Sequence, residues 1–398
     1  MLSIEDKTKC CGCTACKNIC PQQCIKMEPD FEGFLYPKID KEKCIECDAC
    51  VRVCPVLKHQ VIQDQYQEAY ALRTKNDSDL KASTSGGFTT PLALWLFSQN
   101  GTLWTANFDE EWNVCHEKFD SADLRFKTSK GSKYVQSDLK DTFSNIQEEL
   151  NNEKMVCFIG TTCQVYGLKS FLGREYDNLV TVDLVCHGTP SPKLWKKYVE
   201  YQEKCYGAKI EEVNFRNKTY GYHSGTMMIK FDNGMKYTGS ARVDFMLKSF
   251  FSEISSRPSC YSCAFKDKYR VSDFTIFDCW HMEDLVFGVQ DDDNGYTNVL
   301  IQSEKGKQIF KQIREQYDAY AVDVEKAIAL DGIMVEHSAT PHVGRCEFYK
   351  DIEQHDLKTH IEKHIKIKKI DYFLEASKTI VYKLGLMNIL RKIRRVRA

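Results

Sequence analysis

The sequence of 398 residues is long enough for two or three domains, and its 42% hydrophobic and 28% charged residues are typical of a soluble globular protein. Its formal net charge of -1 gives no electrostatic reason to expect binding to nucleic acid. Nineteen cysteines would indicate disulfides in a short secreted chain, but this chain is long and shows no signal peptide. We therefore expect reduced thiols and a cytoplasmic protein.

Two cysteine runs open the chain, and each follows the spacing C-x2-C-x2-C-x3-C-P. This is the bacterial ferredoxin spacing, in which three thiolates hold one [4Fe–4S] cluster and the fourth ligates the other cluster. We therefore expect one cluster on Cys10, Cys13, Cys16 and Cys54, and a second on Cys44, Cys47, Cys50 and Cys20. Zinc is the alternative, but structural zinc sites use paired C-x2-C units, and a third thiol before Cys-Pro disfavours them. Cys11 and Cys24 fall outside the spacing and are predicted to be spare thiols.

The first part of the chain divides at a change of composition. Residues 1–58 form the ferredoxin-type segment, with a β-type stretch and a glycine turn over 31–37. Residues 59–68 are polar and glutamine-rich and are predicted to be a linker. A short strand is expected at 69–72, and residues 83–88 lead into a helix that starts near Pro91.

A β-α-β unit is the clearest pattern in the middle of the chain. The apolar runs 155–160 and 179–186 predict two buried strands, and the helix between them ends at Gly173. The two strands should be parallel, with a right-handed crossover. Cys163 and Cys186 then lie at the carboxyl ends of the strands, on one edge of the sheet, where open α/β sheets place their ligands.

The remaining elements indicate an α+β fold. A helix is expected from 190–192 to about Tyr206, a hairpin over 226–238 around Asn233-Gly234, a helix over 243–255 and a strand over 273–279. The predicted fold is a small ferredoxin-like two-cluster domain followed by an α/β core with a β-α-β unit and added hairpins. The core should span 69–350, and a helical basic tail should span 351–398.

Six segments in order resemble the beta-subunit family of coenzyme F420 hydrogenases and dehydrogenases. They are 84–88 (TSGGF), 131–137 (GSKYVQS), 160–164 (GTTCQ), 183–190 (DLVCHGTP), 257–263 (RPSCYSC) and 272–276 (SDFTI). Members of this family are iron–sulfur flavoproteins, so the resemblance implies FAD. It also implies a third [4Fe–4S] cluster, for which the candidate ligands are Cys163, Cys186, Cys260 and Cys263. Zinc at these thiols, or ordinary buried cysteines, are the alternatives.

Candidate flavin contacts lie in two loops. Ser85, Gly86 and Gly87 precede a helix, and backbone N–H groups at a helix start suit phosphate oxygens. Lys133 and Arg257 could supply positive charge. A plain helix-entry turn is the alternative for the two glycines. The chain contains neither GxGxxG nor GxxxxGK[ST], so a Rossmann-type NAD site is unsupported.

These features predict an oxidoreductase that passes electrons between a ferredoxin-like carrier, or a partner subunit, and a small organic two-electron acceptor. The alternative is an electron-transfer subunit without a substrate of its own. Familiar family members read Gly-Asp-Phe-Trp-Gly where this chain has residues 277–281 (FDCWH), so use of F420 does not follow from the resemblance.

The carboxyl-terminal residues 378–398 alternate apolar with basic side chains. This pattern suits an amphipathic helix on an anionic membrane surface or an acidic partner. The alternative is a solvated terminal helix that packs on the body of the protein through Ile389, Leu390 and Ile393.

Overall fold

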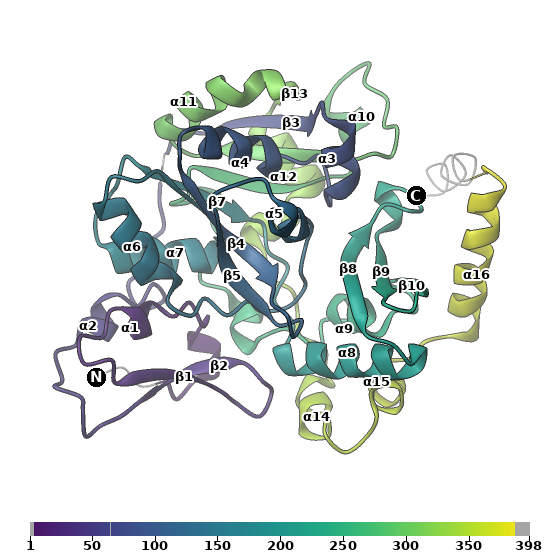
Figure 1. The fold of residues 1–398 in the computed structure, drawn as a ribbon, viewed down its shortest axis with the longest axis horizontal. Helices are drawn as coiled ribbons and strands as arrows, with labels where there is room; N and C mark the ends of the chain where they lie inside the picture. Colours follow the sequence, from purple (N-terminus) through teal and green to yellow (C-terminus); the bar gives the residue numbers. More distant parts are fainter. Residues whose placement is uncertain (1–3, 64, 387–398) are drawn as a thin grey trace. The chain divides into compact units, whose positions relative to one another are not determined.

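The computed structural model describes residues 4–63 and 65–386 (Figure 1). Its chain divides into two compact units. The first combines Met1–Lys193 with Ser256–Thr340, and the second combines Leu194–Ser255 with Pro341–Ala398. The predicted boundaries do not coincide with this division, because residues 1–58 pack in the same unit as the core sheet whereas 194–255 belong to the second unit. The α+β fold class, with its small ferredoxin-like region and sheet-rich core, is confirmed.

The cysteine-rich segment is a small arrangement with an internal repeat. Its elements are η1 (Lys7–Lys9), α1 (Ala15–Asn18), β1 (Ile25–Pro29), β2 (Leu35–Ile39) and α2 (Ala49–Arg52). β1 and β2 form an antiparallel hairpin whose turn contains Gly33, at a φ of 89°. Thr14 and Asp48 adopt left-handed backbone before α1 and α2, at φ values of 63° and 55°. Each bends the chain between the second and third cysteines of its run.

An eight-stranded mixed sheet forms the core of the first unit, in the order β13-β3-β12-β11-β7-β6-β4-β5. The strands are β3 (Glu68–Thr74), β4 (Thr102–Phe108), β5 (Val114–Phe119), β6 (Val156–Thr161), β7 (Leu179–Leu184), β11 (Phe274–Cys279), β12 (Tyr296–Ile301) and β13 (Tyr317–Val322). The central strands β11, β7, β6 and β4 run parallel, and antiparallel strands complete both sides.

Helices cover both faces of this sheet (Figure 1). On one face, α4 (Thr89–Ser98) and α11 (Glu304–Ile313) pack through Leu92 and Phe310. On the other face, α6 (Thr142–Asn151) and α7 (Thr162–Leu172) pack through Phe143 and Leu168. The remaining helices of this unit are α3 (Asp77–Ala82), α5 (Leu124–Ser129), η3 (Pro258–Ser262), α10 (Met282–Leu285), η4 (Arg314–Gln316), α12 (Val324–Asp331) and α13 (Ile333–Glu336).

The predicted β-α-β unit is confirmed as β6-α7-β7. β6 and β7 pair in parallel, and α7 ends at Gly173, whose φ of 66° suits glycine. Gln164 reaches back at the start of α7, where its Oε1 accepts the N–H of Thr161 at 2.9 Å. This contact stabilises the sharp turn between β6 and α7, which places Cys163 in the first turn of the helix.

The second unit contains a three-stranded sheet in the order β10-β9-β8. Its elements are α8 (Pro192–Tyr206), β8 (Ile210–Asn217), η2 (Tyr222–Ser224), β9 (Thr226–Phe231), β10 (Lys236–Ser240), α9 (Phe245–Phe251), α14 (Arg345–Lys350), α15 (Leu357–His364) and α16 (Lys369–Lys383). The predicted hairpin is β9 with β10, which pair antiparallel. The helix predicted over 243–255 is shorter, and Glu253 beyond it has a φ of 58°.

The predicted tail helix falls only partly within the described residues. α16 includes Lys378 and Lys383. Its basic continuation, with the apolar residues Ile389, Leu390 and Ile393 expected to pack on the body, lies outside the described residues. Among the helices that are described, none is long and apolar enough to cross a membrane.

Candidate cluster centres and flavin site

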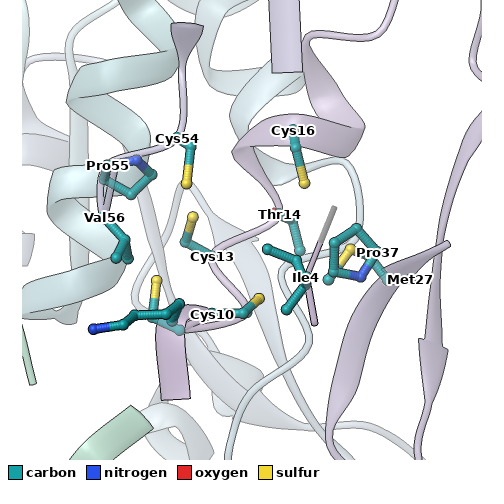
Figure 2. Close-up of a pocket in the computed structure, with 13 residues that line it drawn as sticks. Ile4, Cys10, Cys13, Thr14, Cys16, Met27, Pro37, Cys54, Pro55 and Val56 are labelled. Atoms are coloured by element: carbon teal, nitrogen blue, oxygen red, sulfur yellow. The ribbon is translucent and has the colours of Figure 1, made fainter. Parts of the chain in front are cut away.

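The first predicted ligand set surrounds one pocket in the cysteine-rich segment. Figure 2 shows Cys10, Cys13, Cys16 and Cys54 around this pocket, with Pro55 beside Cys54. Cys10 and Cys13 precede α1, Cys16 lies within it, and Cys54 comes from the end of the other run. Burial raises the pKa of the Cys16 thiol to about 12. A metal must therefore displace a proton that the buried thiol otherwise holds.

The second predicted set lines another pocket. Cys44, Cys47 and Cys50 come from one run and Cys20 from the other, so the last cysteine of each run has crossed. Cys24 also lines this pocket, with its Sγ 3.4 Å from Sγ of Cys20. The sequence predicts Cys24 to be spare, whereas the structure places it beside a predicted ligand.

The four core cysteines gather at one edge of the large sheet. Cys163 is in the first turn of α7, Cys186 follows β7, Cys260 is in η3 and Cys263 directly follows it. Their thiols are close enough to influence one another electrostatically, and Cys186 interacts with the other three. Burial raises the pKa of Cys186 and Cys260, and that of Cys263 to about 12. The structure therefore brings together all four residues that the sequence proposes.

Cys11 connects the first set to the core set. Its thiol is close enough to the thiols of both Cys13 and Cys163 to interact with them electrostatically. The sequence predicts Cys11 to be spare because it breaks the ferredoxin spacing. Only the packing of α1 against α7 places it between the two groups. No local sequence signal could have found this position.

Arg257 lies against the first set and also contacts Gln136, in the same segment as Lys133. It is 1% exposed, and its Nε donates to the carbonyl of Cys10 at 2.7 Å. Its Nη2 donates to the carbonyl of Leu35 at 3.0 Å and lies 3.6 Å from Sγ of Cys10. Its Nη1 donates to Gln136 Oε1 at 2.9 Å. The guanidinium therefore fixes the Cys10 loop and places positive charge beside a predicted cluster ligand.

A buried ion pair supports the sheet edge that carries the core cysteines. Arg270 pairs with Asp183, and both side chains are at most 1% exposed. Thr162 and Ser272 each donate to Asp183 at 2.8 Å. Asp183 is therefore a hydrogen-bonded structural residue, and no local sequence pattern indicates its partner Arg270. The pair ties the end of β7 to α7 and β11.

The two predicted flavin loops are neighbours. Ser132 N–H donates to Thr84 Oγ1 at 2.8 Å, which joins the loop of Lys133 to that of Ser85, Gly86 and Gly87. Gly87 has a φ of 77°, and α4 begins without a side-chain cap. Gly86, however, donates its N–H to Thr297 Oγ1 at 2.8 Å, and its carbonyl accepts from Thr74.

Lys133 is a half-buried cation of this region. In the described part of the chain its Nζ donates to carbonyl oxygens, of Ser129 at 2.8 Å and of Gly131 at 3.4 Å. Burial lowers the pKa of Lys133 to about 7. The ammonium also lies 5.5 Å from the centroid of the Phe108 ring. A poorly solvated ammonium without an anion in direct contact is costly. Its surroundings therefore fit a ligand with phosphate groups.

Sequence-family comparisons agree with this geometry. Residues 153–327 match the family model for the carboxyl-terminal part of the beta subunit of coenzyme F420 hydrogenase/dehydrogenase. Residues 9–57 and 36–82 each match a 4Fe-4S dicluster domain. The first match contains all four core cysteines, and the second contains both ferredoxin runs.

Comparisons with individual proteins add less. No curated protein gives a significant match. One similar solved chain comes from the xenon-derivatised F420-reducing [NiFe] hydrogenase complex of Methanosarcina barkeri. It is 17% identical, with a TM-score of 0.43, and the likeness covers 77% of this chain and 93% of that chain.

The dicluster match and the paired thiol sets define an iron–sulfur electron-transfer protein. Residues 153–327 belong to the family of the carboxyl-terminal part of coenzyme F420 hydrogenase/dehydrogenase beta subunits, and an N-terminal 4Fe-4S dicluster domain precedes them.

Proposed function

We propose that this protein is an iron–sulfur flavoprotein oxidoreductase. It passes electrons between a ferredoxin-like carrier, or a partner subunit, and an organic two-electron acceptor. The observation that carries the proposal is the continuous set of thiols in the first unit. Two groups of four line neighbouring pockets, and Cys11 joins the first of them to the four core cysteines.

The cofactors and the protein side chains have separate roles in this proposal. When bound, the clusters supply one-electron transfer and FAD supplies two-electron storage. The twelve predicted ligand cysteines hold and space the metal centres. Arg257 holds the Cys10 loop in position through three carbonyl or amide acceptors and keeps a positive charge next to Cys10.

Support for FAD comes from the Lys133 region. The half-buried ammonium of Lys133, which donates to carbonyl groups and lies over the Phe108 ring, suits a diphosphate. So do the uncapped start of α4 and the positive φ of Gly87. Gly86 contributes to the loop's position by its small size, because a Cβ there would lie 2.2 Å from the carbonyl oxygen of Leu72. Its N–H is already bonded to Thr297, so we assign phosphate contact to Lys133 and the residues after Gly86.

The second candidate function is an electron-transfer subunit that serves an associated enzyme. The engaged N–H of Gly86 favours it, because one of the predicted phosphate donors is already taken. The FDCWH segment also favours it. The Trp280 N–H donates to Asp331 Oδ2 at 3.1 Å and His281 Nδ1 lies 2.7 Å from Asp331 Oδ1, so the segment that departs from familiar family members is tied down within the protein.

The test is the cofactor content of protein purified without oxygen. We expect about twelve irons and about one FAD per chain. A Cys260→Ser/Cys263→Ser double variant should lose roughly four irons and keep the rest, because the N-terminal ligands are separate. The matched control is Cys205→Ser/Cys346→Ser, at two exposed thiols, which should keep all of the iron.

Each outcome separates the hypotheses. Iron without flavin would favour the electron-transfer subunit. Unchanged iron in the Cys260/Cys263 variant would show that these thiols are structural. Zinc in place of iron throughout would contradict both functions.

A further inference from the structure

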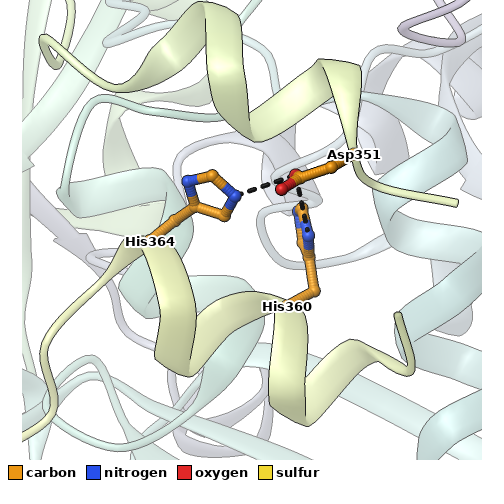
Figure 3. A group of neighbouring side chains, drawn as sticks. All are labelled: Asp351, His360 and His364. Atoms are coloured by element: carbon orange, nitrogen blue, oxygen red, sulfur yellow. Dashed lines mark hydrogen bonds and ion pairs between the residues drawn. The ribbon is translucent and has the colours of Figure 1, made fainter. Parts of the chain in front are cut away.

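A cluster of ionisable side chains lies in the second unit, outside every site described above. Asp351 caps the end of α14, and His360 and His364 lie one turn apart on α15 (Figure 3). Positions i and i+4 share one face of a helix, so both imidazoles face the same carboxylate. His364 Nε2 is 2.8 Å and His360 Nδ1 is 3.4 Å from Oδ1 of Asp351.

His360 is the unusual member of this cluster. It is 0% exposed, and neither ring nitrogen has a hydrogen-bond partner among the described residues. Buried polar groups almost always have partners, and an exception calls for an explanation such as an ion. The ring packs against Phe348, with centroids 4.5 Å apart. The apolar face of the imidazole therefore has a packing partner, whereas its nitrogens have no hydrogen-bond partner among the described residues.

We propose that Asp351, His360 and His364 bind a divalent transition-metal ion of the zinc type. Two imidazole nitrogens and one carboxylate oxygen are a common zinc ligand set, with a fourth position left for water. One ligand atom from each residue lies within 4.8 Å of the others, in the described residues. Ligands at about 2.0–2.2 Å from a tetrahedral zinc lie about 3.3–3.6 Å apart, so small side-chain adjustments bring these three atoms to the ion.

Lys363 is the competing cation. Its ammonium contacts Oδ2 of Asp351, which leaves Oδ1 toward the two histidines. The Lys363 side chain is 50% exposed and can turn to solvent. The backbone of the site is held more firmly, because Asp356 caps the start of α15 and Leu357 and Ile361 are buried.

Zinc itself is the probe, measured on the full chain purified without oxygen. We expect about one zinc per chain in addition to the iron. Zinc-edge X-ray absorption should show a nitrogen and oxygen shell near 2.0–2.1 Å and no sulfur shell near 2.3 Å. This readout separates the proposed site from zinc bound by misloaded cysteines, and it does not depend on any variant.

Variants then assign the ligands. His364→Gln and Asp351→Asn should each weaken zinc binding at least tenfold in competition with a chromophoric chelator, with iron content unchanged. His337→Gln, at an exposed histidine, should bind zinc as the wild type does. Absence of zinc, or sulfur-ligated zinc that persists in both variants, would overturn the proposal.

Discussion

The sequence predicts the same role for Arg257 and Lys133, but the structure gives them different surroundings. Arg257 is buried and Lys133 is half-buried, and each stands in a segment that resembles the family. Arg257 meets the backbone of Cys10 and Leu35, which belong to the opening segment of the chain. Lys133 donates to carbonyl groups of its own loop. Residue type and local pattern identify a charged position, whereas its partner depends on which distant loop packs against it.

Arg257 should set the reduction potential of the cluster on Cys10. Removing its charge from beside the Cys10 sulfur disfavours the more negative, reduced cluster. A charge-assisted hydrogen bond of about 1.5–3 kcal/mol corresponds to a decrease of roughly 60–130 mV in Arg257→Gln. Arg257→Lys should show a smaller decrease because it keeps the charge. Redox titration followed by EPR measures the shift.

The control for Arg257 is Arg73→Gln. Arg73 lies in β3, and its side chain pairs with Asp292. The cluster potentials of this variant should equal those of the wild type. Equal potentials in Arg257→Gln with full iron content would show that Arg257 acts only on the loop structure.

Lys133 should make FAD binding depend on pH. Since burial lowers its pKa to about 7, the free side chain loses its proton above that pH, and binding of an anion must then take up a proton. The Kd for FAD should rise by up to tenfold per pH unit above 7. Flavin-depleted protein titrated with FAD between pH 6 and 9, followed by flavin fluorescence, measures this slope.

Two variants at Lys133 give opposite expectations. Lys133→Arg stays charged and should bind FAD with little pH dependence, whereas Lys133→Met should bind weakly at every pH. Lys127→Met, at an exposed lysine nearby, should keep the wild-type slope. A wild-type slope in Lys133→Met would move the phosphate site elsewhere.

At the scale of elements, the contact of α7 with the loop into α1 joins the dicluster segment to the core. A Cβ at Gly167 of α7 would lie 2.7 Å from Cβ of Cys13 and 3.0 Å from its sulfur. Gly167→Val should therefore displace Cys13 and remove up to about four irons from the first centre. Iron analysis with EPR of the reduced protein measures the loss.

The matched control is Lys169→Val, on the same helix, where the side chain pairs with the exposed Glu175. This variant should retain all of the iron, because it places the same β-branched side chain in the helix without touching Cys13. If Gly167→Val also kept full iron and unchanged EPR spectra, the packing of α7 would not position Cys13.

Elements formed by neighbours in sequence could be predicted, and elements formed by distant residues could not. β6-α7-β7 follows from two apolar runs, a capping residue and Gly173, all within one short stretch of the chain. The crossed cysteine sets follow from spacing alone. Cys11 could not be placed, because its position depends on Cys163 of α7, which lies far from it in the sequence.

At the scale of the whole molecule, the strand order of the large sheet could not be predicted from the sequence either. β3 pairs with β12 and β13, which come near the end of the first unit, although β4 is the next strand after β3 in the chain. Propensity and periodicity carry no information about such pairings. The division into two units likewise depends on residues 194–255 joining residues after 340, which no composition change along the chain indicates.

The most direct test of the proposed electron path is a reductive titration of anaerobically purified protein, followed by visible absorption and EPR. We expect about five electrons per chain, one for each of three clusters and two for the flavin. The flavin absorption should bleach in the same titration. Uptake of only about two electrons, with no flavin bleaching, would contradict the proposed path and leave only the two N-terminal centres.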